Sequence, residues 1–367
     1  MNEMKLLSAL ATAGLLFSTG ALAASITPAS VTKTIKVGET FTVNKTITLD
    51  PTGAGVVDIF FLADNTGSMG GVIGNVKSVA GTLLSDLSST YASAQFGVGR
   101  YLGDPIEGFS PTIAYHLQQA IDPSVVSTQI AINNWFASGG GDVPEANFFA
   151  LHQVATSGAP TPTNVSTGFN TGWRSGAVKV VLWFGDAPSH TETITEAQTI
   201  NALKANSVIV MGFNSSADNF ALDGSYVGES NQCDDVTNAT GGTCFHNFAS
   251  QSASAMASTI KSAIGTVTST LDLVFGHTFV GDGLAIVMTC TDPLGCNDVK
   301  GGESRTFDLT VTGLKPGTYS FDVFANGVSA KEIDNITVVN DIPEPATLGL
   351  LGLGLLGLGL ARRRASR

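Results

Sequence analysis

The sequence predicts an α/β domain, with a central, mostly parallel sheet and helices on both faces, inserted in or flanked by a small β-sandwich. Two observations support this fold class. Between residues 55 and 270, apolar strands alternate with helical patterns, which is typical of a parallel sheet with helical crossovers. On either side, residues 24–54 and 271–341 show strand patterns without helices.

The elements of the α/β domain follow from the periodicity of its apolar residues. Strands are expected where apolar runs are short, and helices where apolar residues recur every three or four positions. Pro144 favours the start of the helix predicted at residues 145–155, because proline suits the first helical position. The predicted strands cover residues 56–63, 95–102, 177–184 and 208–213, and the predicted helices cover 72–87, 125–136, 145–155, 193–205 and 250–264.

The flanking segments together contain seven predicted strands. Two lie before the α/β domain and five after it, which is the strand count of a minimal immunoglobulin-like sandwich. We therefore expect residues 24–54 and 271–341 to complete one sandwich, with the α/β domain, residues 55–270, inserted between them. The predicted strands are residues 30–37, 40–49, 271–279, 284–290, 305–312, 318–325 and 333–339.

Both ends of the chain carry transport signals. Residues 1–23 combine Lys5, an apolar stretch and a small-residue exit, which is typical of a secretory signal peptide. At the other end, residues 342–367 contain Pro343-Glu344-Pro345, a short Gly/Leu span and a cluster of arginines. The Gly/Leu span is shorter than the roughly 20 residues that cross a bilayer comfortably, and the arginines favour the cytoplasmic side.

This C-terminal arrangement resembles the PEP-CTERM sorting signal of Gram-negative bacteria. The resemblance implies that an exosortase, a membrane transpeptidase-like enzyme, acts on the tail. It also implies transient anchoring in the inner membrane by this tail, followed by transfer to the cell surface or the extracellular polysaccharide matrix. A plain tail anchor is the alternative.

Composition narrows the class of protein further. The net charge is −12 and no basic stripe is present, which argues against nucleic acid as a partner and suits divalent cations. Four cysteines fit an oxidising compartment and allow three pairings, of which the local bridges Cys233–Cys244 and Cys290–Cys296 are the simplest. A zinc site is the alternative, but it lacks support from a CxxC motif or paired histidines.

Three acidic segments lie at the carboxyl ends of predicted strands or in the loops between them, where open α/β sheets bind ligands. Their carboxylates and hydroxyls favour Mg²⁺ or Ca²⁺, with Mn²⁺ also compatible, over zinc or copper. The segments contain Asp64, Thr66 and Ser68, then Asp142 and Glu145, and finally Asp186. The histidines are scattered, and we interpret His116, His152, His190, His246 and His277 as surface or loop residues.

The segment Asp64-x-Thr66-x-Ser68 resembles the metal-ion-dependent adhesion site of the von Willebrand factor A family, with threonine in place of the first serine. The resemblance implies a Rossmann-like von Willebrand factor A domain. It also implies that Asp64, Thr66, Ser68 and Asp186 hold a divalent cation directly or through water.

The loop "GGDVPE" resembles the Asp-x-Pro-Glu loop of integrin β subunits, which implies that Glu145 also reaches the metal. The same comparison implies a candidate second metal position at Asp142, the Pro144 carbonyl and Glu145. Other positions depart from the integrin pattern. Gly71 and Val72 stand where an acidic pair is expected, and Gly103 replaces an aspartate, with Asp104 one position further on.

The sequence thus predicts a secreted or surface-associated binding protein that is not an enzyme. Its divalent cation would bind an acidic group of a protein or of an exopolysaccharide. One alternative is a serine hydrolase with Ser68 as nucleophile, assisted by Asp186 and either His190 or His246 in the chain order of α/β-hydrolases. A second alternative is a purely structural matrix protein whose metal only stiffens the loops.

Overall fold

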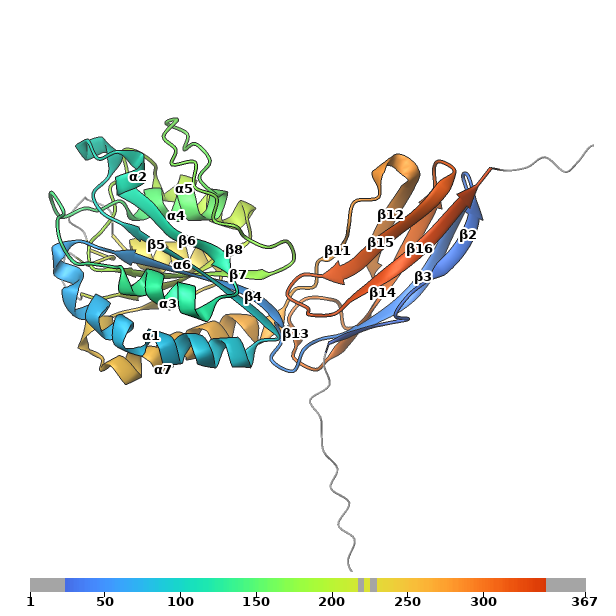
Figure 1. Ribbon diagram of the computed structural model, residues 1–367, viewed down its shortest axis with the longest axis horizontal. Helices are drawn as coiled ribbons and strands as arrows, with labels where there is room; N and C mark the ends of the chain where they lie inside the picture. The colour runs from blue at the N-terminus through green and yellow to red at the C-terminus, as the bar shows by residue number, and fades with distance from the viewer. Residues whose placement is uncertain (1–23, 217–220, 225–229, 341–367) are drawn as a thin grey trace, which may run out of the picture.

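The computed structural model describes residues 24–216, 221–224 and 230–340, and Figure 1 shows an α/β unit beside a β-sandwich. A six-stranded sheet forms the centre of the α/β unit, in the order β6-β5-β4-β7-β8-β9, and only β6 is antiparallel to its neighbour. This is the doubly wound strand order. The strands are β4 (Val56–Asp64), β5 (Ser93–Tyr101), β6 (Tyr115–Asp122), β7 (Val178–Gly185), β8 (Val208–Asn214) and β9 (Cys244–Phe245).

Helices cover both faces of this sheet, which explains why β4 is apolar along most of its length and buried in nearly every residue. Apolar side chains of α1 (Gly70–Thr90), α3 (Val125–Asn133) and α7 (Ala253–Thr268) pack with Ile59 and Phe61 of β4. On the opposite face, α4 (Asn147–Thr156), α5 (Glu196–Ala205) and α6 (Gln232–Thr240) pack with Phe60 and Leu62. Figure 1 shows the two helix layers, with α2 (Pro111–Ala114) at the rim.

The sandwich is built from strands that precede and follow the α/β unit. One sheet has the order β1-β3-β14-β12, and the other has the order β11-β15-β16-β2. N-terminal strand β3 pairs with β14, while β2 pairs with β16 in the facing sheet, so both sheets need both parts of the chain. The strands are β1 (Ser25–Thr27), β2 (Thr32–Lys36), β3 (Thr40–Thr48), β11 (Phe275–His277), β12 (Leu284–Cys290), β14 (Ser304–Gly313), β15 (Gly317–Ala325) and β16 (Lys331–Val339).

The two crossings between the units lie side by side. The backbone N–H of Ala54 donates to the carbonyl of Thr268 at 2.8 Å, and the N–H of Gly55 donates to the carbonyl of Gly327. A side chain at Gly53 would collide with the carbonyl oxygen of Thr268, so this contact requires glycine. A short ribbon of β10 (Thr270–Leu271) and β13 (Val299–Lys300) follows the second crossing.

The predicted fold class is confirmed, but several elements differ. The predicted strand 271–279 is divided between β10 and β11, and the sandwich has eight strands instead of seven because β1 was not predicted. Edge strand β6 was not predicted, because its sequence YHLQQAID has few apolar residues and its side chains are mostly half-buried. Helix α6 was not predicted either, since QCDDVTNAT has a weak apolar pattern. Helix α4 begins at Asn147, two residues after the predicted start at Glu145.

The proposed signal peptide and the sorting segment with Pro343, Glu344 and Pro345 lie outside the described residues. Within the part of the chain that the structure describes, no helix combines the length and apolar character needed to cross a membrane.

Candidate metal centre

The predicted ligand segments meet at the carboxyl edge of the central sheet. Asp64 is the last residue of β4, and Asp186 follows the last residue of the adjacent parallel strand β7. Glu145 lies in the loop before α4. Its backbone forms an isolated β-bridge with Ser189, which lies in the loop after β7. This edge is where open α/β sheets place their ligands.

The turn from 64 to 68 presents its oxygens toward Asp186. The Thr66 N–H donates to Asp64 Oδ1 at 2.7 Å, which fixes one oxygen of this carboxylate. The hydroxyls of Thr66 and Ser68 lie 3.3 Å apart, and Ser68 Oγ donates to Asp186 Oδ1 at 3.1 Å. Residues separated by 118 positions in the chain are therefore in direct contact.

The loop that carries Glu145 is fixed to both other segments. At its beginning, the Ser138 N–H donates to the Asn65 carbonyl at 3.0 Å, beside the 64–68 turn. At its end, the Glu145 N–H donates to the Pro188 carbonyl at 2.9 Å, and the His190 N–H donates to the Glu145 carbonyl at 3.0 Å. Backbone hydrogen bonds thus hold the three segments in one arrangement.

Two carboxylates of this centre are buried, and no lysine or arginine of the described part of the chain pairs with them. Asp64 and Glu145 are 0% and 3% exposed, and Asp64 Oδ2 and Glu145 Oε2 have no hydrogen-bond partner among the described residues. Burial and the nearby charge of Asp186 raise the pKa of Asp64 to about 7. Burial, Asp64 and other neighbouring carboxylates raise the pKa of Glu145 to about 10. Both side chains are therefore poised to gain from a positive charge.

A second buried aspartate of β4, Asp58, has a charged partner within the protein. Asp58 is also 0% exposed, but Arg174 donates to its Oδ1 through Nε at 2.6 Å and to its Oδ2 through the backbone N–H at 2.8 Å. Arg174 thus neutralises Asp58 near the beginning of the strand, whereas at its end no lysine or arginine among the described residues pairs with Asp64. Carboxylates and hydroxyls are hard oxygen ligands, so this donor set fits Mg²⁺ or Ca²⁺.

Beside the metal centre, Asp142 belongs to a second acidic cluster that includes a histidine. His190 Nε2 lies 3.4 Å from Asp142 Oδ2 and 3.5 Å from Glu107 Oε2. His190 lies in a loop, as expected, but its side chain is only 10% exposed. The same expectation is wrong for His152, which is buried within helix α4. Sequence reasoning missed Glu107, because its partners lie far along the chain. Asp104 instead caps the turn at Glu107, accepting from Ile106 N–H at 3.0 Å.

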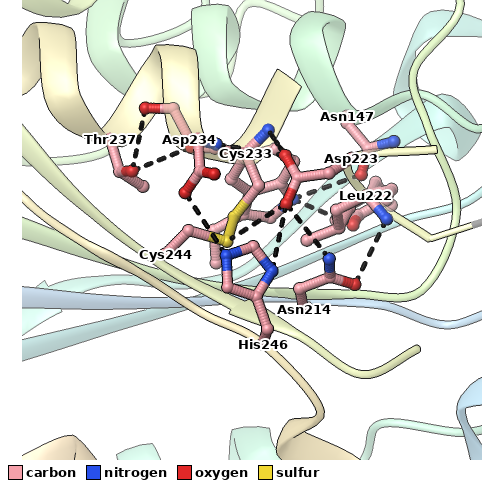
Figure 2. Close-up of a disulfide and its surroundings, with 11 residues drawn as sticks. Asn147, Asn214, Leu222, Asp223, Cys233, Asp234, Thr237, Cys244 and His246 are labelled. Carbon is pink, nitrogen blue, oxygen red and sulfur yellow. Dashed lines mark hydrogen bonds and ion pairs between the residues drawn. A yellow bond between two sulfur atoms is a disulfide. The ribbon is translucent and has the colours of Figure 1, made fainter. Parts of the chain in front are cut away.

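A third cluster surrounds the disulfide Cys233–Cys244 (Figure 2). Asp223 Oδ1 accepts from the backbone N–H of Cys233 at 2.7 Å, and His246 Nδ1 lies 3.3 Å from Asp223 Oδ2. The other ring nitrogen, Nε2, lies 3.4 Å from Asp234 Oδ1, so the histidine bridges two carboxylates. The sulfurs are bonded to each other and offer no thiolate to a metal. The second disulfide joins Cys290 and Cys296 in the sandwich.

Replacing both Cys233 and Cys244 by serine is expected to lower the free energy of unfolding of the α/β unit by about 2–4 kcal/mol, because the bridge ties α6 to β9. All three tryptophans of the chain lie between residues 55 and 270, so tryptophan fluorescence in a urea titration reports on this unit. The matched control is the double serine variant of Cys290 and Cys296, which should leave the fluorescence transition unchanged. Equal shifts in both variants would contradict the prediction.

The C-terminal tail gives a direct match to a known signal. Residues 341–364 match the PEP-CTERM protein-sorting motif. The chain therefore carries a tail of the kind found on exosortase-sorted cell-surface proteins. No curated protein sequence matches the chain.

Solved structures similar to this chain include von Willebrand factor type A from Catenulispora acidiphila. It is 13% identical, has a TM-score of 0.41, and the match covers 87% of this chain and 74% of that chain. The pilus adhesin SpaC from Lactobacillus rhamnosus GG, in its open conformation, is 12% identical with a TM-score of 0.37. That match covers 82% of this chain and 45% of SpaC. The α/β unit is von Willebrand factor A-like in its own strand order and in its two helix layers.

Proposed function

We propose that this chain is a secreted or surface-associated binding protein that holds a divalent cation at the carboxyl edge of its α/β domain. The cation would be held by Asp64, Thr66, Ser68, Asp186 and Glu145, directly or through water. It would bind an acidic group of a protein or of an exopolysaccharide. The chain would act as a non-catalytic binding module.

One observation carries this proposal. Two buried carboxylates, Asp64 and Glu145, converge with two hydroxyls and a third carboxylate at one sheet edge, and among the described residues no lysine or arginine pairs with either of them. Burying unpaired charge is strongly unfavourable, so the arrangement favours a cation from solution. The bound cation would supply positive charge for an acidic ligand, while the two neutral hydroxyls offer oxygens without adding negative charge.

The surroundings of Asp142 support a role for this residue in binding a second cation beside the first. Its carboxylate lies beside His190, and its charge contributes to the raised pKa of Glu145. We keep Asp142, Pro144 and Glu145 as the candidate second metal position, to which the structure adds Glu107 and His190 as neighbours.

The sorting motif supports a surface location in a Gram-negative bacterium. We propose residues 1–23 as the signal peptide and 342–367 as the exosortase-processed tail, which anchors the protein transiently in the inner membrane. Residues 24–54 and 271–341 would form the sandwich domain around the von Willebrand factor A domain, residues 55–270. The sheet topology supports this division, because each of the two sheets contains strands from both segments, joined by the pairs β3–β14 and β2–β16.

The geometry favours binding over hydrolysis. Ser68 Oγ donates to Asp186 and contacts Thr66, whereas the rings of His190 and His246 pair with other carboxylates. Among the described residues, Ser68 thus has no histidine within hydrogen-bond reach to act as its base, as a serine nucleophile requires.

Binding to an immobilised polyuronate such as alginate tests the proposal. We expect the protein to bind in Mg²⁺ or Ca²⁺, to be released by EDTA, and to lose most binding as Ser68→Ala, which removes one hydroxyl ligand. Calorimetry with the metal alone should show weaker metal affinity in this variant. Ser89→Ala is the matched control, because Ser89 is an exposed hydroxyl that donates only to the Asp86 carbonyl in its own helix.

The outcomes separate the alternatives. Metal binding with no effect on capture of the polyuronate or of acidic peptides would favour a structural role for the ion. Ester hydrolysis that is lost in Ser68→Ala but unaffected by EDTA would favour the hydrolase. Unchanged metal affinity in Ser68→Ala would remove this residue from the ligand set.

A further inference from the structure

Three charged side chains meet in the core of the sandwich. Lys45, Glu332 and Asp334 are 0%, 3% and 0% exposed. They occupy inward-facing positions of their strands, where Lys45 in β3 alternates with apolar residues such as Ile47, and the two acids in β16 continue into Ile336. Three charges therefore stand where the alternation calls for apolar residues.

The lysine amine is in contact with both acids. Lys45 Nζ lies against Glu332 Oε1, and it lies 3.4 Å from Asp334 Oδ1 and 3.3 Å from Asp334 Oδ2. Because the two oxygens of Asp334 are almost equally distant, the amine faces the carboxyl group as a whole and not one oxygen alone. The amine also lies 3.5 Å from the Pro28 carbonyl.

The two oxygens of Asp334 have different environments. Oδ1 accepts a hydrogen bond from the backbone N–H of Val31, which would stabilise negative charge that develops on this oxygen. Oδ2 is buried and faces only the Lys45 amine among the described residues, and the carboxylate of Glu332 likewise has Lys45 as its charged partner. Burial is the main reason why the pKa of Glu332 is raised, so this group takes up a proton readily.

We propose that Lys45 and Asp334 become joined by an amide bond between Nζ and Cγ, with Glu332 as the proton carrier. The amine gives a proton to Glu332 and its nitrogen attacks Cγ, forming the C–N bond. The bond from Cγ to Oδ2 then breaks. Two of the three ammonium protons end on Oδ2, which leaves as water, the third stays on the amide nitrogen, and Glu332 returns to its starting state.

Two physical effects favour this condensation. An ion pair in an apolar core carries a desolvation penalty, and conversion of one amine and one carboxyl to a neutral amide removes two of the three buried charges. The fold holds the reacting groups in contact, so no encounter has to be arranged, and the buried position keeps bulk water away from the product.

The bond would connect the two sheets of the sandwich. It would also connect the chain before the α/β unit to the chain after it, since Lys45 and Asp334 are 289 positions apart. This inference concerns the sandwich alone and does not depend on the metal centre.

Peptide mapping of the full chain, produced in cells that lack exosortase and denatured before digestion, tests the proposal. Trypsin does not cleave after an acylated lysine, so we expect residues 37–77 to remain uncut at Lys45 and to be joined to the peptide that begins at Glu332. The branched peptide should weigh one water less than the sum of its two parts. Neither part contains cysteine, so a disulfide cannot account for the link.

Three variants complete the test. Lys45→Arg keeps the charge and the trypsin site and should give three linear peptides, namely 37–45, 46–77 and the peptide that begins at Glu332. Glu332→Gln keeps both reacting groups but removes the proton carrier, so it should also leave Lys45 and Asp334 unjoined. Lys331→Arg is the matched control, because Lys331 is an exposed lysine of the same strand that pairs with Asp322, and it should keep the branched peptide. Linear peptides in the unaltered protein would mean an ordinary buried ion pair. A branch at Glu332, or full joining in Glu332→Gln, would overturn the assigned roles.

Discussion

Replacing Asp64 by asparagine is expected to stabilise the metal-free protein and to abolish its stabilisation by divalent cations. The asparagine is nearly the same size as the aspartate and removes a buried, unpaired charge. In the unaltered protein this charge is disfavoured by burial and by the nearby Asp186. Without the carboxylate, the centre also loses its most deeply buried ligand for a cation.

The effect of Asp64→Asn depends on pH. Since the pKa of Asp64 rises from 3.8 to about 7 on folding, the folded state binds the extra proton more tightly. The stability of the metal-free protein therefore falls as pH rises from about 4 to about 7, and the variant should not show this part of the fall. Above about pH 7 we expect the variant to be more stable by about 2–4 kcal/mol.

Urea titrations followed by tryptophan fluorescence, in EDTA and in Mg²⁺, measure both effects. Asp86→Asn is the matched control, because Asp86 is an exposed aspartate that pairs with Lys261 across α1 and α7. This control should keep the metal response and change stability little. A metal response that persists in Asp64→Asn would exclude Asp64 as a ligand.

Arg174→Met is expected to destabilise the α/β unit by about 3–5 kcal/mol, because it leaves the Asp58 carboxylate buried without its cation. The arginine also donates through Nη1 to Ser93 Oγ at 2.7 Å and through Nη2 to the Val57 carbonyl at 3.1 Å. Its loss therefore removes several contacts at the start of the sheet. The same fluorescence titration measures the change.

The double variant Asp58→Asn, Arg174→Met separates lost charge pairing from lost packing. We expect it to recover a substantial part of the stability lost in Arg174→Met, because no unpaired carboxylate remains. If the double variant is as unstable as Arg174→Met, packing of the arginine is the larger contribution.

Much of the fold was predictable because its signals are local. The apolar run of β4 and the helical spacing in α1 each identify their element within one short window. The spatial meeting of Asp64 and Asp186 was also expected, since carboxyl ends of parallel strands share one edge. The assignment of these residues as metal ligands stays a prediction.

The clusters that sequence reasoning missed depend on partners far apart in the chain. The contacts of the loop residue His190 were missed because Glu107 and Asp142 approach it only in the folded protein. In β3, Lys45 interrupts an inward-facing row of apolar residues, and this break in alternation was a signal that could have been used. The charged partners of Lys45 could not be identified from the sequence, because they lie in β16, and only the sheet topology shows where β16 lies relative to β3.

The side-by-side crossings at Ala54 and Thr268 determine how the molecule would transmit a pulling force. They lie near the beginning of β4, while Asp64 lies at its end, about 30 Å away for a nine-residue strand. Tension between a captured ligand and the cell envelope would therefore run along the strands of the central sheet. The hydrogen bonds that join β4 to β5 and β7 lie across this direction, so they would share the load simultaneously instead of opening one after another.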